Sequence, residues 1–253
     1  MKEMTLVEHL EELRKTLIRV VFIVVGAFFI AYSFGQYISD FLLMPLRAAL
    51  ASQNQLAPEM AQGQIVYLGI LDKVISQLQV AFWTSLIISS PLWFWQIWKF
   101  IKPGLHEFEV KAVRPFLLVG FFLFIIGVSF GYFVVFPITF ETLMTFGVDN
   151  VAATISLKEY LVLSSKVLVF LGLVFQLPNI LLILGFMGLV TKYSLKEKRR
   201  YIYVGFAVLS AVMTPPDIIT MMGLWFPLVC LFEVGVLAVA LVVHPYLARQ
   251  HSS

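Results

Sequence analysis

Two carboxylates beside long apolar runs carry the most evident chemistry in this sequence. Glu12 lies just before the first run, and Glu109 lies in the charged stretch Gln96–Arg114 between two later runs. A carboxylate accepts two parallel hydrogen bonds from a guanidinium, a geometry that a lysine ammonium does not copy. The two acids therefore predict a pair of anionic points that grip cationic groups of a visiting chain. The alternative is that both are solvated charges, with Glu12 paired to Lys15 and Glu109 near Lys111, at about 0.2–0.5 kcal/mol for such a helical pair.

Three polar side chains lie inside apolar runs: Lys166, Gln176 and Glu233. A charge near the centre of a membrane helix costs about 2.5–3.5 kcal/mol on insertion scales, so such residues usually face protein or water. One interpretation is a relay in a proton- or ion-coupled transporter of small molecules. The other is hydrogen bonding to neighbouring or partner helices, with the lysine head group reaching the membrane surface.

Motifs for catalysis or cofactor binding do not occur in the sequence. It has no phosphate-binding glycine loop, no Gly-x-Ser-x-Gly pattern and no His-Glu-x-x-His pattern, and Cys230 is its one cysteine. His9 and Glu12 share a His-x-x-Glu spacing with His106 and Glu109, which would suit zinc, but two solvated helix ends are the simpler interpretation. We therefore predict no catalytic residue, no metal and no cofactor, and a protein that is not an enzyme.

The composition indicates an integral membrane protein. Of the 253 residues, 60% are hydrophobic and 13% are charged, whereas a soluble domain keeps roughly a quarter of its residues charged. The hydropathy pattern predicts an all-α polytopic fold in a single membrane domain, 1–253, with an amphipathic helix at 1–15 and a retained first span rather than a cleavable signal peptide. Six transmembrane helices are predicted, at about 16–34, 78–100, 115–136, 160–187, 201–213 and 218–243.

Short local signals predict where the helices begin and how they pack. Three capping boxes predict helix starts, at Thr5–Glu8, Ser156–Glu159 and Ser194–Glu197. Three glycines predict a close approach of the third span to a neighbour, namely Gly120, Gly127 and Gly131. Residues 35–77 predict a polar connection with short helices, and residues 137–155 predict a loop. The fifth span is short, at about 20 Å of helix.

Six spans put both termini on one side of the membrane, and the basic residues indicate which side. All Lys and Arg residues except Arg47, Lys73, Lys158 and Lys166 then fall on the side of the termini. The positive-inside rule makes that side cytoplasmic. The loops around 99–114 and 191–200 are therefore predicted to be cytoplasmic as well.

Motifs along nearly the whole chain, in order and with compatible spacing, resemble those of the TatC family, the multi-spanning receptor subunit of the twin-arginine, Sec-independent protein translocase. The matching pieces are His9–Arg14, Pro45, Ser90–Leu105 with Glu109, Phe130–Pro137, Phe175–Pro178, Leu195–Tyr201, Met213–Asp217 and Cys230–Gly235. The Pro-Pro-Asp turn, the Phe-Pro end of the third span and the Pro-Gly-Leu-x-x-x-Glu loop are the strongest combination.

The resemblance implies a receptor in the bacterial cytoplasmic (inner) membrane that binds twin-arginine signal peptides of folded precursor proteins at the cytoplasmic face. It implies nucleation of a translocase driven by the proton gradient. Two residues would contact the arginines and four would shape the site: Glu12 and Glu109, then Leu13, Arg14, Phe100 and Pro103.

The resemblance also implies partners and architecture. Single-span subunits of the TatA/TatB type are the expected partners, together with further copies of the chain and the lipid bilayer, and no nucleic acid is expected. The shape would be a cup with short fifth and sixth helices, and Pro45, Pro215 and Asp217 would be structural on the periplasmic side. Relatives often carry Glu where this chain has Gln176, so that site holds a polar group which does not titrate.

Overall fold

The computed structural model describes residues 6–56, 64–102, 107–145, 154–213 and 218–243, most of them helical. The first half contains α1 (Leu6–Ser33), α2 (Gly35–Leu56), β1 (Gln64–Val66), α3 (Asp72–Ile88), α4 (Ser90–Ile101) and α5 (Glu107–Phe130). The second half contains the π-helical turn η2 (Gly131–Val135), α6 (Phe136–Thr145), β2 (Thr154–Ser156), α7 (Leu157–Val174), α8 (Leu177–Phe186), α9 (Lys192–Met213), α10 (Ile218–Ala238) and a second π-helical turn, η3 (Val239–Val243). The predictions at Thr5, Pro103, His106, Pro215 and Asp217 lie outside the described residues.

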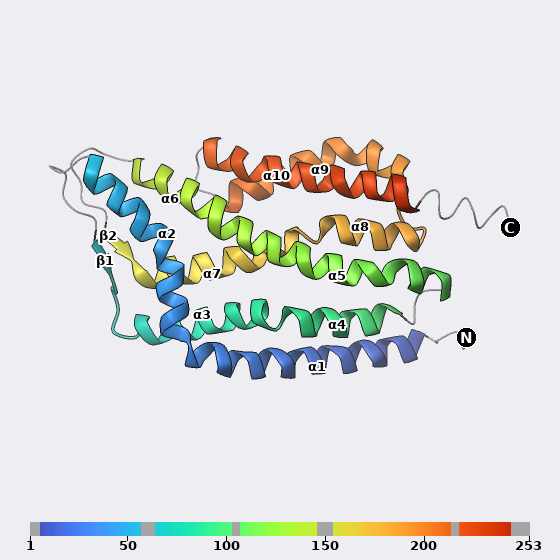
Figure 1. Cartoon of the computed structure of the whole chain (residues 1–253), viewed down its shortest axis with the longest axis horizontal. Coiled ribbons are helices and arrows are strands. Elements are labelled where there is room, and N and C mark those ends of the chain that lie inside the picture. The colour runs from blue at the N-terminus through green and yellow to red at the C-terminus, as the bar shows by residue number, and fades with distance from the viewer. Residues whose placement is uncertain (1–5, 57–63, 103–106, 146–153, 214–217, 244–253) are drawn as a thin grey trace.

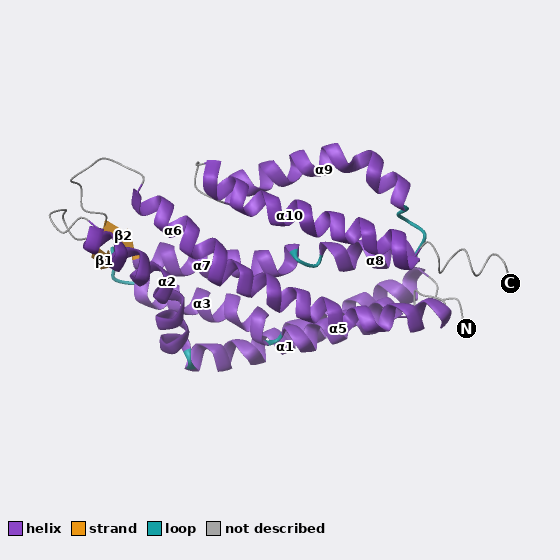
Figure 2. Cartoon of the chain, turned by 45° about the horizontal axis from the view of Figure 1, so that its top comes forward, coloured by secondary structure: helices purple, strands orange, loops and turns teal. Residues whose placement is uncertain are grey.

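The long helices lie side by side along the long axis of the molecule (Figure 1 and Figure 2). The starts of α1, α5 and α9 lie at one end of this bundle, together with the end of α4. Lys99 and Lys192 lie at the same end, which we call the cation-rich end. The two short strands mark the opposite end, which we call the strand end.

Four helical stretches in the described part of the chain are long and apolar enough to cross a membrane: Val7–Ser33, Leu117–Thr142, Leu157–Phe186 and Ile218–Val243. The pair α3 and α4 passes the same test together, although the two helices are bent by 57°. α9, whose first turns are strongly charged, is not among these stretches. The fold is therefore that of a multi-pass helical membrane protein.

The second predicted span is bent at Ser89, between α3 and α4. Pro91 lies in the first turn of α4 and has no N–H to continue the α3 hydrogen bonds. Side chains satisfy two of the carbonyls near the break: the Ser89 hydroxyl donates to the Ser85 carbonyl at 2.6 Å, and the Trp93 indole donates to the Leu86 carbonyl at 2.9 Å. The span predicted at about 78–100 is therefore made of two helices, α3 and α4, with a bend between them.

The third span continues past its predicted end. The Phe136 N–H donates to the Gly131 carbonyl, five residues back, and the wider π turn carries the helix past Pro137 into α6. The predicted loop at 137–155 is therefore wrong in its first part, since α6 runs to Thr145. Among the described residues, the apolar stretch Leu117–Thr142 includes both helices.

Near the N-terminus, one helix agrees with the prediction and the connection after it does not. The amphipathic segment and the first span form one continuous helix, α1, because no helix breaker separates them. The connection that follows holds α2, a single helix of 22 residues, rather than several short ones. Pro45 lies inside α2 without ending it.

Near the C-terminus, the fifth predicted helix is longer than its predicted range 201–213, whereas the sixth covers its predicted range 218–243. α9 begins at Lys192, two residues before the predicted box, because Thr191 and Ser194 cap each other: the backbone N–H of each residue donates to the side-chain hydroxyl of the other at 3.2 Å. α10 continues through η3, so the apolar stretch Ile218–Val243 has 26 residues, as many as Leu117–Thr142. The short sixth helix implied by the resemblance is therefore not found.

Pro45 releases a carbonyl that a tyrosine from another helix binds. Because proline has no N–H, the Phe41 carbonyl lacks its usual partner four residues on. The Tyr132 hydroxyl donates to this carbonyl at 2.8 Å, and its ring stacks on the Phe41 ring at 4.4 Å between centroids. One residue further, the Tyr160 hydroxyl donates to the Leu42 carbonyl at 2.6 Å. These two hydrogen bonds join α2 to η2 and α7 at the turn that precedes Pro45.

Tyr132→Phe should destabilise the protein by about 1–3 kcal/mol, since it leaves a half-buried carbonyl without a donor. Pro45→Ala restores a backbone N–H at position 45, so Tyr132→Phe should cost less in that background. Thermal unfolding of the four proteins in detergent measures this coupling. The exposed Tyr37, at 77% relative accessibility, provides the control Tyr37→Phe; equal losses for Tyr132→Phe in both backgrounds would refute the assignment.

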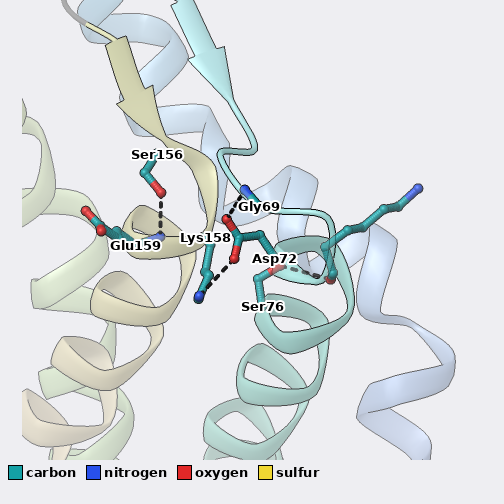
Figure 3. A network of polar contacts seen from close by, with 7 residues as sticks. Gly69, Asp72, Ser76, Ser156, Lys158 and Glu159 are labelled. Carbon is teal, nitrogen blue, oxygen red and sulfur yellow. Dashed lines mark hydrogen bonds and ion pairs between the residues drawn. The ribbon is translucent and has the colours of Figure 1, made fainter.

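At the strand end, β1 and β2 form a parallel pair in the register Gln64↔Thr154, Ile65↔Ile155 and Val66↔Ser156. The two helices that follow these strands are also joined there (Figure 3). The Lys158 ammonium donates to one Asp72 oxygen at 2.8 Å, and the Gly69 N–H donates to the other at 2.7 Å. The Ser156 hydroxyl accepts from the Glu159 N–H, so the helix start predicted at this position is confirmed, with Ser156 as its N-cap.

Acid should weaken the contact between α3 and α7. The hydrogen bond from Lys158, and then the one from the Gly69 N–H, hold the pKa of the Asp72 carboxyl below its ordinary value; Asp72 precedes the apolar part of α3. A lowered folded-state pKa stabilises the fold above the unfolded pKa, and this contribution is lost as the pH falls through the folded pKa. Asp72→Asn should therefore be less stable than the parent at pH 7, and the gap should close below about pH 4. A gap that stays constant in detergent melts from pH 7 to pH 3 would contradict this.

Glycines bring α5 and η2 close to α7, as predicted. A Cβ on Gly127 would lie 2.8 Å from the Leu171 carbonyl oxygen, and a Cβ on Gly131 would lie 2.8 Å from a Leu171 side-chain carbon. On the facing helix, a Cβ on Gly172 would lie 2.7 Å from the Phe124 ring. The third and fourth spans therefore pack at nearly backbone distance, which buries the centre of the bundle.

Candidate functional site

At the cation-rich end, the first turns of α1 pack against the last turns of α4. The His9 and Phe100 rings stack there, 4.5 Å between centroids and 22° between planes. One turn further along α1, Glu12 is half-buried. Its Oε2 atom is buried and has no hydrogen-bond partner among the described residues. The site therefore holds an anionic acceptor beside an aromatic pair.

The solvated ion pair considered for Glu12 does not form. The Lys15 ammonium instead lies 2.8 Å from Glu11, on the exposed face of α1. Buried polar atoms in proteins are almost always hydrogen-bonded. An unpaired carboxylate oxygen at the end of two helices is therefore an atom that a ligand's donor can satisfy.

The structure describes some of the other predicted site residues fully and others only in part. Leu13 is half-buried beside Glu12, Arg14 is exposed on the same helix, and Phe100 belongs to the stacked pair. Glu109 lies in the first turn of α5, whose start is at the cation-rich end, but its side chain is outside the described part of the structure. The described residues thus bring Glu12 and Phe100 to one site and put the Glu109 backbone at the same end.

A second polar site lies within the bundle. Gln176 is buried at the junction of α7 and α8, and its Nε2 donates to the Gly120 carbonyl at 2.8 Å. Its Oε1 and the Oδ1 of buried Asn179 have no partner among the described residues. Both amides line a cavity of about 360 Å³, whose walls are otherwise apolar and aromatic and include Trp93 and Trp98. A largely apolar group that carries one neutral hydrogen-bond donor would match these apolar walls and the two amide oxygens.

Gly120 makes room for the two amides, since a Cβ there would lie 2.5 Å from the Asn179 amide nitrogen and 3.0 Å from Gln176 Oε1. The predicted close approach at Gly120 is therefore to polar side chains. Asn179 was not predicted as a site residue. Its position three residues after Gln176, next to Pro178, was the available signal.

Glu233 and Lys166 lie in separate surroundings. The carboxylate of Glu233 accepts from the Arg199 guanidinium and from the Tyr203 hydroxyl, joining α10 to α9. Lys166 is exposed on α7 and has no described ion pair. The described contacts therefore do not connect Glu233, Lys166 and Gln176 into the relay that a transporter would need.

The described residues hold no cluster of three or more His, Cys, Asp or Glu side chains that could bind a metal. Cys230 is free and exposed on α10. His9 uses its ring in the stack on Phe100, and His106 lies outside the described residues.

The fold and the site together define the class of protein: an α-helical, multi-pass membrane protein with an acidic and aromatic site at its cation-rich end. The model of the Sec-independent protein translocase protein (TatC) family matches residues 8–227 of this chain. The chain belongs to the TatC family.

Relatives and solved structures agree with this assignment. The Sec-independent protein translocase protein TatC of Desulforapulum autotrophicum is 38% identical over 232 residues, covering 91% of this chain and 82% of the relative. The corresponding proteins of Helicobacter pylori and Escherichia coli are 34% and 32% identical, over 94% and 91% of this chain and 87% and 86% of their own lengths. A crystal structure of a twin arginine translocase receptor, TatC, superposes with a TM-score of 0.77 at 28% identity, covering 93% of this chain and 99% of that one.

Proposed function

We propose that this chain binds the twin-arginine signal peptides of folded precursor proteins at the cation-rich end of the bundle. The observation that carries the proposal is the half-buried Glu12 near the His9–Phe100 stack, whose Oε2 has no donor in the described part of the chain. A guanidinium supplies two parallel N–H donors to one carboxylate, so it matches this carboxylate better than an ammonium does. The solved relative titled a twin arginine translocase receptor supports the same ligand class.

Glu109 is proposed as the second acid of the site, with Leu13, Arg14, Phe100 and Pro103 around it. The first turn of α5 puts the Glu109 backbone at the same end as Glu12. Two separate carboxylates would each hold one arginine of a pair, which explains a requirement for two adjacent guanidinium groups.

The proposed setting is the bacterial cytoplasmic membrane, with six crossings and the cation-rich end in the cytoplasm. Four or five crossings are the apolar stretches described above, and α9 would be the additional one. The basic first turns of α9 would lie at the cytoplasmic surface, in agreement with the positive-inside rule. Pro45, Pro215 and Asp217 would then shape the periplasmic side.

Translocation would need further subunits and an energy source. We propose single-span partners of the TatA/TatB type, association with other copies of the chain, and transport driven by the proton gradient. The cavity at Gln176 and Asn179 is the proposed contact for a polar side chain on a partner's membrane helix, since the two amide oxygens there accept no hydrogen bond from any described residue.

Photo-crosslinking of a twin-arginine signal peptide to membranes that contain this protein tests the binding function. Glu12→Ala with Glu109→Ala should remove the crosslink, whereas Glu11→Ala with Glu159→Ala removes two acids elsewhere and should preserve it. A peptide with two lysines should compete poorly. A persistent crosslink in the first double variant, or equal competition by the lysine peptide, would disprove the proposal.

A further inference from the structure

Gln96, in the middle of α4, has a side-chain oxygen that no described group donates to. Its Oε1 atom is buried and unpartnered, as is Oε2 of Glu12 on the neighbouring helix α1. The Gln96 side chain as a whole is half-buried, so the amide is not simply in solvent. Two acceptors that are unpaired among the described residues, on adjacent helices, are available to a donor from a bound ligand.

The stacked rings fix the level of these two side chains along the helices. α1 and α4 lie side by side and run in opposite directions, and His9 meets Phe100 (Figure 1 and Figure 2). Glu12 follows His9 by three residues, and Gln96 precedes Phe100 by four. At a rise of 1.5 Å per residue they lie about 4.5 Å and about 6 Å beyond the ring pair, in the same direction. The two acceptors are therefore at almost the same height.

Helical rotation puts them on the same flank as well. At 3.6 residues per turn, Glu12 is rotated by about 60° from the direction of His9, and Gln96 by about 40° from that of Phe100. Because the helices are antiparallel, these two rotations turn both side chains to the same side of the plane through the helix axes. Leu13 is rotated to the other side. A carboxylate and a carboxamide therefore lie on the same flank of the α1–α4 pair, at almost the same height.

The two oxygens together suit a guanidinium. This group has five N–H donors in one plane, and a carboxylate accepts two of them. In a half-buried site the remaining donors need a further acceptor, and a neutral amide oxygen supplies one without adding charge. An ammonium has three donors on one compact atom, which the carboxylate and water satisfy.

We propose that Gln96 is a specificity-determining residue, which accepts a hydrogen bond from the same guanidinium that Glu12 binds. The inference rests on the proposed function, because it assigns a further contact in the same site. It makes Gln96 one reason why an arginine is preferred over a lysine at one of the two positions of the signal peptide.

Purified protein in detergent and four signal peptides test the inference, with Arg-Arg, Arg-Lys, Lys-Arg and Lys-Lys at the paired positions. Gln96→Met keeps the length of the side chain and removes the acceptor, so it should weaken Arg-Arg binding about tenfold, as expected for a hydrogen bond to a charged group. For one of the two single-lysine peptides the variant should have almost no further effect, which identifies the arginine that Gln96 contacts. Gln96→Glu keeps an acceptor and should bind Arg-Arg at least as tightly as the parent. Gln79→Met, which removes another half-buried glutamine on α3, should match the parent.

Three outcomes would overturn the inference. Equal weakening of all four peptides by Gln96→Met would indicate a structural role, and an unchanged affinity would indicate no contact. A Gln96→Glu variant as weak as Gln96→Met would show that the amide donates to Glu12 instead of accepting from the ligand. Glu12→Ala separates these results from the proposed function: its failure to weaken Arg-Arg binding would refute the function itself, whereas a strong effect there with none at Gln96 would refute the inference alone.

Discussion

Gly127→Ala should destabilise this protein by about 1–3 kcal/mol, the cost usual for overpacking a close contact. The added methyl carbon would lie 2.8 Å from the Leu171 carbonyl oxygen and 2.8 Å from the Cβ of Phe175. A backbone oxygen does not rotate away as a side-chain end does, so α5 and α7 must separate. The separation would also disturb Gly131, which contacts the same leucine. The midpoint of thermal unfolding in detergent measures the loss.

Two other glycines are matched controls for this substitution. Gly26 and Gly205 also lie inside long helices, α1 and α9, but no neighbouring atom lies within 4 Å of a Cβ built on either. Alanine has a higher helix propensity than glycine by about 1 kcal/mol, so Gly26→Ala and Gly205→Ala should be neutral or stabilising. If Gly127→Ala had the same midpoint of thermal unfolding as these controls, the close packing of α5 on α7 would not limit stability.

The features that the sequence predicted well depend on local patterns. The Ser156 cap needs only residues three apart, and the glycines of the third span mark a close contact without naming the partner. Apolar length predicted the stretches that end at Ser33, Phe186 and Val243 to within a turn or two. Each of these features is decided by side chains within one or two helical turns.

The features that were missed depend on residues far apart or on how a proline is accommodated. β1 and β2 have three residues each, and their parallel pairing joins segments that the sequence separates widely. Pro91 bends a span, whereas Pro45 and Pro137 lie within continuing helices, because a tyrosine hydroxyl or a π turn compensates for the missing N–H. A single sequence does not show which compensation is present.

The candidate site also combines residues that local sequence patterns predicted with residues that depend on packing between distant segments. Glu12 was predicted because an acid beside an apolar run is conspicuous, and Phe100 came from the family motif. Gln96 stood in the stretch that drew attention, but its importance depends on the register of α1 against α4, which the His9–Phe100 stack sets. Asn179 lies beside Gln176 because Gly120, on the facing helix, has no side chain to occupy that space. Non-local packing thus decides which polar residues share a site.

Glu12→Arg should abolish binding of a twin-arginine peptide, with a loss of at least a hundredfold in affinity at physiological salt. Two unit charges about 4 Å apart interact by about 4 kcal/mol at an effective dielectric constant of 20. Reversing one sign replaces that attraction with an equal repulsion, and roughly a third of the change already corresponds to a hundredfold. Arginine also fills the space in which the peptide guanidinium would stack beside Phe100.

Glu11→Arg is the control that separates the site from net charge. It lies one residue away on the same helix and makes the same change of two charge units, but Glu11 is exposed and paired with Lys15. Salt screens exposed charges within about 8 Å at physiological ionic strength, so Glu11→Arg should weaken binding by no more than about threefold. Fluorescence anisotropy with a labelled peptide distinguishes the two variants. Equal losses in both would mean that the peptide responds to the overall potential of α1 and not to the carboxylate beside Phe100, and unimpaired binding by Glu12→Arg would exclude Glu12 from the site.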